Sequence, residues 1–491
     1  MASAGVARFA LVPPGPAGRR RAFAALSLPL AALLTALALS SGRTAVMGGV
    51  ALVGLAAAPT LARLRSEPLD APGLYAAATF LTFGVTGLAW LGTPEGPGPG
   101  LDQADVGRAL AVVALGLAAL GAGSRLAGPA RPSAPPAGGA TPHLMVLAVA
   151  YAVALVATGA GFVLGTYGYV ADVGAGQSAA AWTSFVAAMG SVTILAVALS
   201  WLTSRESRFG VLLVALLLVQ VPIGFVAGVK GESLIAPVLV GLAYALYRRR
   251  IPWKAAAMVV AVTFLVLVPA NEAYRISLRS PGGASAGTIA DRLTDPGLYR
   301  PDRSVANGVA YGFLRFRHID HVALVVRYTP QEFAFGDGSH YYLLPFFVFV
   351  PRAIWSDKPV LDVPAQFSRT YWQIPPSIRT SQPVTQVGDL FRNFGLPGVA
   401  AGLFAWGILL SLWTRFWRLR RSPRLDLVYL YAMVVGVLYV ESDLPFIIAT
   451  TARSLPLALA VAWLLLPGRA GEPGYLTLRR RMRFRQGHLP V

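Results

Sequence analysis

The chain has 491 residues, of which 55% are hydrophobic and only 13% are charged, whereas an ordinary soluble domain carries roughly 25% charged residues. The net charge is +20, but nucleic-acid-binding proteins keep their cations on a polar surface, and here the cations flank long apolar runs. The composition therefore indicates a membrane protein and argues against a nucleic-acid partner. The absence of cysteine excludes disulfides, thiolate metal sites and cysteine nucleophiles.

Twelve apolar windows meet or approach the roughly 20 residues that a membrane-spanning helix needs. They lie near residues 23–40, 44–62, 72–92, 106–124, 143–165, 180–203, 209–228, 233–247, 253–270, 393–414, 427–440 and 445–466. We expect an all-α, polytopic membrane protein with about 12 transmembrane helices, about nine in residues 1–270 and about three in 392–467. The eighth and eleventh windows are short enough to be tilted, broken or only partly spanning.

The distribution of Lys and Arg predicts the orientation of these spans. Of the 42 cationic residues, 25 fall on one side of the predicted topology, together with only five acids. Because short cytoplasmic connections are enriched in Lys and Arg, we expect this side to face the cytoplasm. Both termini, including the basic tail 468–491, are therefore predicted to be cytoplasmic, and the other side carries balanced charge.

One long connection, residues 271–391, is predicted to lie outside, and we expect it to contain amphipathic helices and the catalytic residues. Val305 to Arg327 is the first predicted helix. Its apolar face would present Ile319, Val322, Ala323 and Val326, and its other face Arg317, Asp320, His321 and Arg327. After a turn at Gly336–Gly338, the run Tyr341–Val350 is too short to span and is predicted to be interfacial or re-entrant.

Further polar residues fall on the same predicted external side. Lys230 follows the seventh window, Glu441 and Asp443 connect the last two, and Arg392 lies where the tenth begins. Arg453 is about two turns into the last window, and an intramembrane Arg is a functional-site hypothesis by default.

At several of these residues the chain resembles the oligosaccharide repeat-unit polymerases of the Wzy-type O-antigen polymerase family. The likeness lies in the Gly-x-Lys-Gly turn at Gly228–Gly231, the charged loop helix around Arg317 and Asp320, the run Pro351–Pro359, and the Gly388–Gly395 stretch. It covers roughly residues 228–400, and Lys230 departs from the Arg expected in many relatives.

The resemblance implies a metal-independent glycosyltransferase without a cofactor. It would polymerise undecaprenyl-pyrophosphate-linked oligosaccharide repeat units into a surface polysaccharide, on the outer face of the bacterial cytoplasmic (inner) membrane. Its partners would be lipid-linked oligosaccharide substrates and membrane lipid, with a flippase and a chain-length regulator as further candidate partners.

The chemistry of such a transfer assigns candidate roles to the residues. The pyrophosphate leaving group needs cationic stabilisation, and the acceptor hydroxyl needs a base. The catalytic candidates are Asp320, His321, Arg317 and Arg352, with Glu441 and Asp443 as secondary acids. The pyrophosphate-binding candidates are Lys230, Arg352, Arg392 and Arg453. Trp355, Tyr371 and Trp372 are candidates for stacking on sugar rings.

Several other interpretations stay open at this level. Asp320 can simply pair with Arg317 three residues earlier, the histidines can be structural, and the aromatic residues can anchor the interface. His318, Asp320 and His321 form a three-residue cluster without an obvious further metal ligand. Alternative functions are a lipid-linked oligosaccharide flippase or transporter, an O-antigen ligase-like transferase, and an envelope scaffold.

Overall fold

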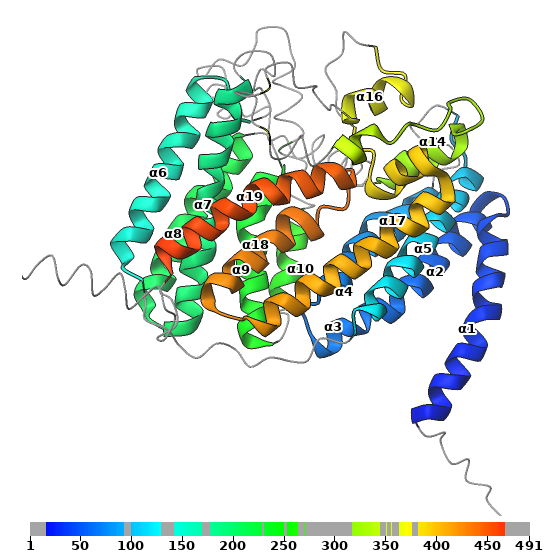
Figure 1. Cartoon of the computed structure of the whole chain (residues 1–491), viewed down its shortest axis with the longest axis horizontal. Helices are drawn as coiled ribbons and strands as arrows, with labels where there is room; N and C mark the ends of the chain where they lie inside the picture. The colour runs from blue at the N-terminus through cyan, green and yellow to red at the C-terminus, as the bar shows by residue number, and fades with distance from the viewer. Residues whose placement is uncertain are drawn as a thin grey trace, which may run out of the picture.

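The computed structural model describes residues 16–92, 100–128, 142–168, 177–227, 230–249, 253–263, 271, 317–343, 350, 355, 363–375 and 382–466. Every regular element in these ranges is a helix, and no strand occurs among them (Figure 1). The predicted all-α class is confirmed.

The helices of the first half precede residue 264. They are α1 Pro16–Ala38, α2 Gly42–Leu61, α3 Arg63–Ser66, α4 Ala71–Thr79, the π-helix η1 Phe80–Val85, the 3₁₀-helix η2 Leu88–Leu91, α5 Gln103–Leu126, α6 Leu144–Val163, α7 Gln177–Ser204, α8 Ser207–Val226, α9 Lys230–Arg248 and α10 Trp253–Val262. The later elements are α14 Ile319–Tyr328, α16 Val363–Thr370, α17 Gln386–Leu419, α18 Pro423–Ala432, the π-helix η5 Met433–Val437 and α19 Leu444–Leu465.

Eight helical segments of the described residues are long and apolar enough to cross a membrane. They are Gly42–Ser66, Ala71–Leu91, Gln103–Leu126, Leu144–Val163, Val186–Ser204, Ser207–Val226, Gln386–Leu419 and Leu444–Leu465. Each overlaps one of the twelve predicted windows, so a polytopic α-helical membrane protein is supported. The remaining four windows fall on α1, α9, α10 and α18 with η5, and a total of twelve spans stays a prediction.

The helices pack in two groups that α18 and α19 connect (Figure 1). In one group α5 packs between α2 and α17, and in the other α6, α8 and α9 surround α7. α19 lies against α7 and α18, and the loop helix α14 rests on α5 and α17. α14 is therefore held at one end of the α5–α17 pair, where the site described below is built.

Glycines let α5 and α17 approach closely. A Cβ at Gly123 would collide with the carbonyl of Phe404, and one at Gly407 with the carbonyl of Leu120. Helices in lipid gain no hydrophobic driving force from each other, so they associate through close packing at small residues. This contact fixes the part of α17 that follows Gly395.

α17 is two helical segments joined at Gly395. This glycine has φ of 64° and ψ of −157°, a left-handed backbone conformation that favours glycine, and Pro397 follows it. The first segment, from Gln386, carries the charged residues, and the second is the long apolar part. The helix thus begins seven residues before the predicted window at 393–414.

The predicted amphipathic helix at Val305–Arg327 needs correction. The described helix is α14, Ile319–Tyr328, and the residues before Arg317 lie outside the described part of the chain. Its residues from Ile319 to Val325 are all buried, including Asp320 and His321 on the face that we predicted to be polar. The reason is that α5 and α17 cover one side of α14 while the segments around Phe367 and Trp372 cover the other. Of the predicted interfacial run, only residues 341–343 and Val350 are described.

Ion pairs gather at the far end of α17, next to α3. Arg418 pairs with Glu67 at 3.0 Å, Arg63 with Asp70 at 2.8 Å, and Arg421 with Asp426 at 3.1 Å. These residues come from connections that the sequence places on one common side. Their pairing agrees with that grouping, while the assignment of this side to the cytoplasm stays a prediction.

Candidate functional site

A buried ion pair stands at the start of α14. Arg317 Nε donates to Asp320 Oδ2 at 2.8 Å, and both side chains are nearly inaccessible. Trp90, at the end of the second candidate span, donates from Nε1 to Asp320 Oδ1 at 2.7 Å, and the Arg317 guanidinium lies 4.7 Å from the centroid of the same indole. Burial raises the pKa of Asp320, against the opposing effects of Arg317 and Trp90. The spacing-based pairing is therefore confirmed.

Arg317 keeps unused hydrogen-bonding capacity. Its Nη2 is buried and has no hydrogen-bond partner among the described residues. A buried guanidinium donor without an acceptor is costly, and such an atom often marks the place of a polar ligand. We refer to Trp90, Arg317, His318, Asp320, His321 and Glu441 as the Arg317 cluster.

His318 and Glu441 bring a second polar pair into this cluster. His318 Nε2 lies 2.8 Å from Glu441 Oε2, although the two residues are far apart in the sequence. The turn that carries Glu441 is fixed by a bond of 3.0 Å from the backbone N–H of Thr385 to the Glu441 carbonyl. His318 Nδ1 is buried and has no partner among the described residues, so it adds another open polar atom.

His321 is held as a neutral imidazole. Its Nδ1 bonds to the carbonyl of Pro383, and a carbonyl only accepts, so the proton lies on Nδ1 and the lone pair on Nε2. Burial, followed by the effect of His318, lowers the pKa of His321 to about 3. The rings of Phe367 and Trp372 pack against it at centroid distances of 5.6 and 5.4 Å. The arrangement supplies a positioned proton acceptor.

A second cluster surrounds Asp389 in the first segment of α17. Asp389 Oδ2 accepts from the Tyr341 hydroxyl at 2.6 Å and lies 3.0 Å from His340 Nε2. Oδ1 accepts from Arg392 Nε at 2.8 Å and from Asn393 Nδ2 at 3.3 Å. We call these five residues the Asp389 cluster. Its carboxylate is fully buried and saturated with donors, as a buried charge requires.

The turn Glu441–Asp443 joins the two clusters. Glu441 contacts His318, and Asp443 caps α19 through a bond of 2.8 Å from the Phe446 N–H. Burial and then the neighbouring charge of Asp389 raise the pKa of Asp443 to about 6. Cations, carboxylates and imidazoles from four separate segments therefore meet at one end of the helical bundle.

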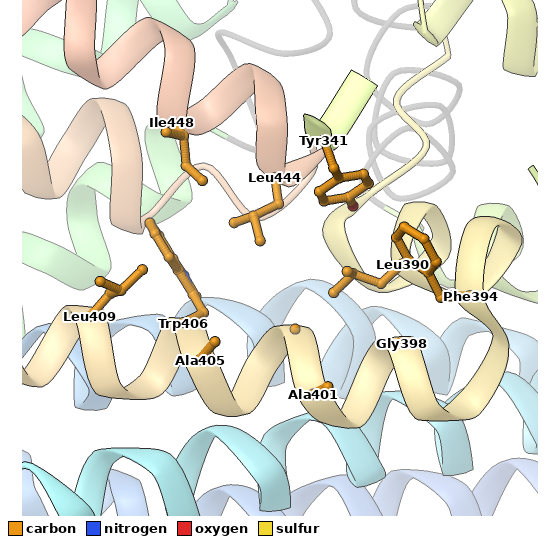
Figure 2. A pocket seen from close by; sticks show the side chains of 11 residues that line it. Tyr341, Leu390, Phe394, Gly398, Ala401, Ala405, Trp406, Leu409, Leu444 and Ile448 are labelled. Atoms are coloured by element: carbon orange, nitrogen blue, oxygen red, sulfur yellow. The ribbon is translucent and has the colours of Figure 1, made fainter. Parts of the chain in front are cut away.

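An apolar groove begins beside the Asp389 cluster and follows α17 (Figure 2). Its volume is about 400 Å³. It is lined by Tyr341, Leu390, Phe394, Gly398, Ala401, Gly402, Ala405, Trp406, Leu409, Leu444 and Ile448. Figure 2 shows the α17 residues forming its floor, with the side chains of Leu444 and Ile448 from α19 opposite them. The groove thus extends from charged groups into the apolar part of the bundle.

Comparison with known protein families gives one match. The profile of the family described as "Domain of unknown function (DUF8712)" matches residues 160–416, more than half of the chain. The chain belongs to the DUF8712 family. No curated protein and no solved structure matches it.

The DUF8712 range contains most of both clusters. It includes Arg317, Asp320 and His321 on α14 and Asp389 and Arg392 on α17. Trp90 and Glu441 enter the Arg317 cluster from outside the range, and Asp443, also outside it, lies beside the Asp389 cluster. The site is therefore assembled from the family domain together with segments on both sides of it.

The structure brings together many of the residues that the sequence singled out. Arg317, Asp320 and His321 lie in the Arg317 cluster with Glu441, and Trp372 packs on His321. Arg392 belongs to the Asp389 cluster, and Asp443 lies beside it.

Three other candidates belong to neither cluster as defined above. The hydroxyls of Tyr371 and Thr329 lie 2.6 Å apart, and the Tyr371 ring packs on Phe333 and Phe367. Its ring is therefore buried in packing, and its role in stacking on a sugar ring stays a prediction. Arg453 is exposed on α19 and makes no ion pair with the described residues. Trp355 is partly exposed, and its neighbours in the sequence lie outside the described residues.

Two candidates fall beyond what the structure describes. Arg352 lies outside the described residues, and so does the side chain of Lys230 at the start of α9. Sequence reasoning missed Trp90, His340 and Tyr341. Trp90 ends an apolar span and looks like an interface anchor, and the other two lie in a loop without a recognisable motif. No group of three or more His, Asp or Glu side chains in the described part of the chain is arranged to hold a metal ion.

The buried neutral state of His321 predicts acid sensitivity. Its folded pKa of about 3 lies below its ordinary value of 6.5. Between these values the unfolded chain binds a proton that the folded protein excludes, so the free energy of unfolding falls as pH falls, by about 1.4 kcal/mol per unit. Between pH 6.5 and 5 the loss amounts to about 2 kcal/mol.

Thermal unfolding of wild type and His321→Gln across this pH range measures the effect. Contributions of other groups, such as Asp443, are shared by the two proteins and cancel in the comparison. The variant is expected to lose less stability on acidification. Equal slopes would contradict the assignment of a neutral buried imidazole.

Proposed function

We propose that this chain is a membrane glycosyltransferase. It would transfer a glycan from a lipid pyrophosphate to a hydroxyl group of another lipid-linked oligosaccharide and so extend a surface polysaccharide. The observation that carries the proposal is the presence, in one buried cluster, of an imidazole whose Nδ1 bonds to the Pro383 carbonyl and of a guanidinium whose Nη2 has no hydrogen-bond partner among the described residues. The resemblance of the loop motifs to repeat-unit polymerases supports the same reaction.

The reaction needs a base and an anion stabiliser, and the Arg317 cluster offers both. In the proposed step the acceptor hydroxyl oxygen attacks the anomeric carbon of the donor sugar, and the bond from that carbon to the pyrophosphate oxygen breaks. The bonding electrons leave with the lipid pyrophosphate, and the hydroxyl proton passes to His321 Nε2. The low pKa of His321 belongs to the site without substrate, and the negative charge of the pyrophosphate would raise it during the transfer. Arg317 would stabilise the growing negative charge.

The remaining residues take supporting roles in this proposal. Asp320 and Trp90 hold the Arg317 guanidinium in place, and the Pro383 carbonyl sets the tautomer of His321. This makes Asp320 a positioning residue and His321 the base, which separates two candidates that the sequence left equivalent. Arg392 would contribute a second cation toward pyrophosphate, and Arg352 and Lys230 remain predictions for the same role.

The orientation forms part of the proposal. By the charge distribution of the sequence, both termini face the cytoplasm of a bacterial cell and both clusters face outward. The repeat units would then be joined on the outer face of the cytoplasmic membrane, after another protein has moved them across.

Removing the protein from its cell and analysing the accumulated lipid-linked glycans tests the proposal. We expect single repeat units on the outer face of the membrane and no polymer. Single units confined to the cytoplasmic face would instead identify a flippase. Full-length polymer that stays on its lipid would identify a ligase-like transferase, and unchanged glycans would rule out all three activities.

A further inference from the structure

A buried carboxylate stands at the opposite end of α17 from the Asp389 cluster. Asp426, in the first turn of α18, accepts through Oδ1 from Trp417 Nε1 at 2.9 Å and from Arg421 Nε at 3.1 Å. Its Oδ2 accepts from the Tyr247 hydroxyl at 3.2 Å. The Arg421 guanidinium also lies 5.3 Å from the ring centroid of Trp417 and 5.9 Å from that of Tyr247. We call these four residues the Asp426 network.

The Asp426 network joins the two groups of helices. Tyr247 belongs to α9 in the group around α7, Trp417 belongs to α17 in the group around α5, and Asp426 belongs to α18, which connects the groups. Tyr429, three residues after Asp426, stacks on Trp417 with ring centroids 3.9 Å apart. Its hydroxyl donates to the Leu69 carbonyl at 2.7 Å. Separating the two groups at this end would therefore break several polar contacts together.

The burial of this network makes opening costly. Asp426 is fully buried, and Trp417, Arg421 and Tyr429 are buried around it. A buried charge that loses its partners is left with the full penalty of desolvation. A buried ion pair contributes little net stability compared with apolar packing, and its best-attested role is to fix one arrangement of helices. The Asp426 network therefore favours one fixed arrangement of α9, α17 and α18.

The opposite end of the bundle has a different character. There, Arg317 Nη2 and His318 Nδ1 are buried without a hydrogen-bond partner among the described residues. The groove of about 400 Å³ between α17 and α19 also begins at that end, beside the Asp389 cluster (Figure 2). Open polar atoms and unfilled space thus gather at the end with the clusters, whereas the Asp426 end is tied across both helix groups.

We propose that the Asp426 network keeps its end of the bundle closed throughout the working cycle, so that α9 and α17 separate only at the end that carries the two clusters. The inference goes beyond the proposed function and does not depend on it. A transporter with alternating access opens each end in turn around a fixed site. A permanent closure at one end would therefore exclude a flippase, and ligands would enter and leave on one side of the membrane only.

Thiol modification tests the closure, and the chain suits this method because it contains no native cysteine. Leu430 is fully buried and lies four residues after Asp426, on the same face of α18. Leu430→Cys therefore places a thiol directly behind the network, and Arg420→Cys places an exposed thiol at the same end. A charged, membrane-impermeant thiosulfonate reagent is applied to native membrane vesicles of both orientations. Mass spectrometry of the full-length protein gives the rate of modification.

The exposed control sets the scale of the expected result. The modification rate of a buried thiol follows the population of the open form. A conformer that takes part in a two-state cycle is typically populated to about 0.1–10%, so we expect Leu430→Cys to react more than about 1,000-fold more slowly than Arg420→Cys. A reaction faster than this limit would show that the Asp426 end opens and would overturn the proposal.

Two tyrosine variants, each combined with Leu430→Cys, test whether the network itself holds the end closed. Tyr247→Phe removes only the hydroxyl that links α9 to Asp426 and keeps the ring, so the fold should persist. The modification rate should rise roughly 10- to 100-fold, the weight of one hydrogen bond to a charged group. Tyr244→Phe, three residues earlier on α9, removes a hydroxyl outside the network and should leave the rate unchanged. Equal rates in the two variants would overturn the proposal.

The modification requires no glycan transfer, so its outcome is separate from that of the proposed function. A protein whose Asp426 end stays closed but that makes no polymer would disprove the proposed function and leave the closure intact. A protein that makes polymer while Leu430→Cys reacts rapidly would retain the proposed function and disprove the closure.

Discussion

Replacing Asp320 by alanine is expected to lower the free energy of unfolding by about 3–5 kcal/mol, because it leaves the buried Arg317 guanidinium without its counter-charge. Both side chains are at most 3% exposed, so water cannot solvate the guanidinium that loses its partner. The variant also removes the acceptor of Trp90 Nε1. Equilibrium unfolding of the purified protein in a fixed detergent measures the loss.

The double variant Arg317→Met with Asp320→Leu is the control. A buried ion pair replaced by apolar side chains of similar volume often leaves stability unchanged or increased. The double variant should therefore regain most of the free energy of unfolding that the single variant loses. It should remain about 1–3 kcal/mol less stable than wild type, because the indole N–H of Trp90 is left without an acceptor. It should nevertheless make no polymer, since the guanidinium is gone.

These two measurements distinguish a structural role of Arg317 from a role in glycan transfer. A double variant that is stable but inactive supports a role in transfer. A double variant that is stable and active would show that the Arg317–Asp320 pair serves only to stabilise the fold. If the single variant loses less than about 1 kcal/mol, the pair is not buried as described.

The sequence predicts the spans better than the site, for a physical reason. A span is a local property, because about 20 consecutive apolar residues fill the bilayer whatever surrounds them. The long apolar windows that became α5, α6 and α8 are therefore found from composition alone. The window at 427–440 shows the limit, since it is α18 followed by the π-turn of η5 and is too short to be judged by apolarity.

The site depends on contacts between segments far apart in the sequence, and no local sequence pattern predicts such contacts. The pairing of Arg317 with Asp320 follows from their spacing, but its burial does not, because it requires Trp90 from a distant span. The same holds for the approach of Glu441 to His318. Spacing thus predicts which neighbours pair, and only the fold shows which of those pairs are removed from water.

Replacing His321 by glutamine is expected to reduce glycan transfer by about 10²–10⁴-fold, the usual contribution of a general base. Glutamine is close in size and retains an N–H that can donate to the Pro383 carbonyl, so packing against Phe367 and Trp372 should survive. It offers no imidazole lone pair to take the acceptor proton. The measurement is kcat/KM with lipid-linked repeat units in vesicles, alongside thermal unfolding at pH 7.5.

His143→Gln is the matched control for this variant. His143 is exposed, precedes α6 without a side-chain cap and belongs to neither cluster, so its replacement should change neither rate nor stability. A His321→Gln protein that is as stable as wild type and still transfers glycan at more than a tenth of the wild-type rate would exclude His321 as the base. The proton would then have to pass to a carboxylate, and Glu441, about one-third exposed beside His318, is the residue placed to take it.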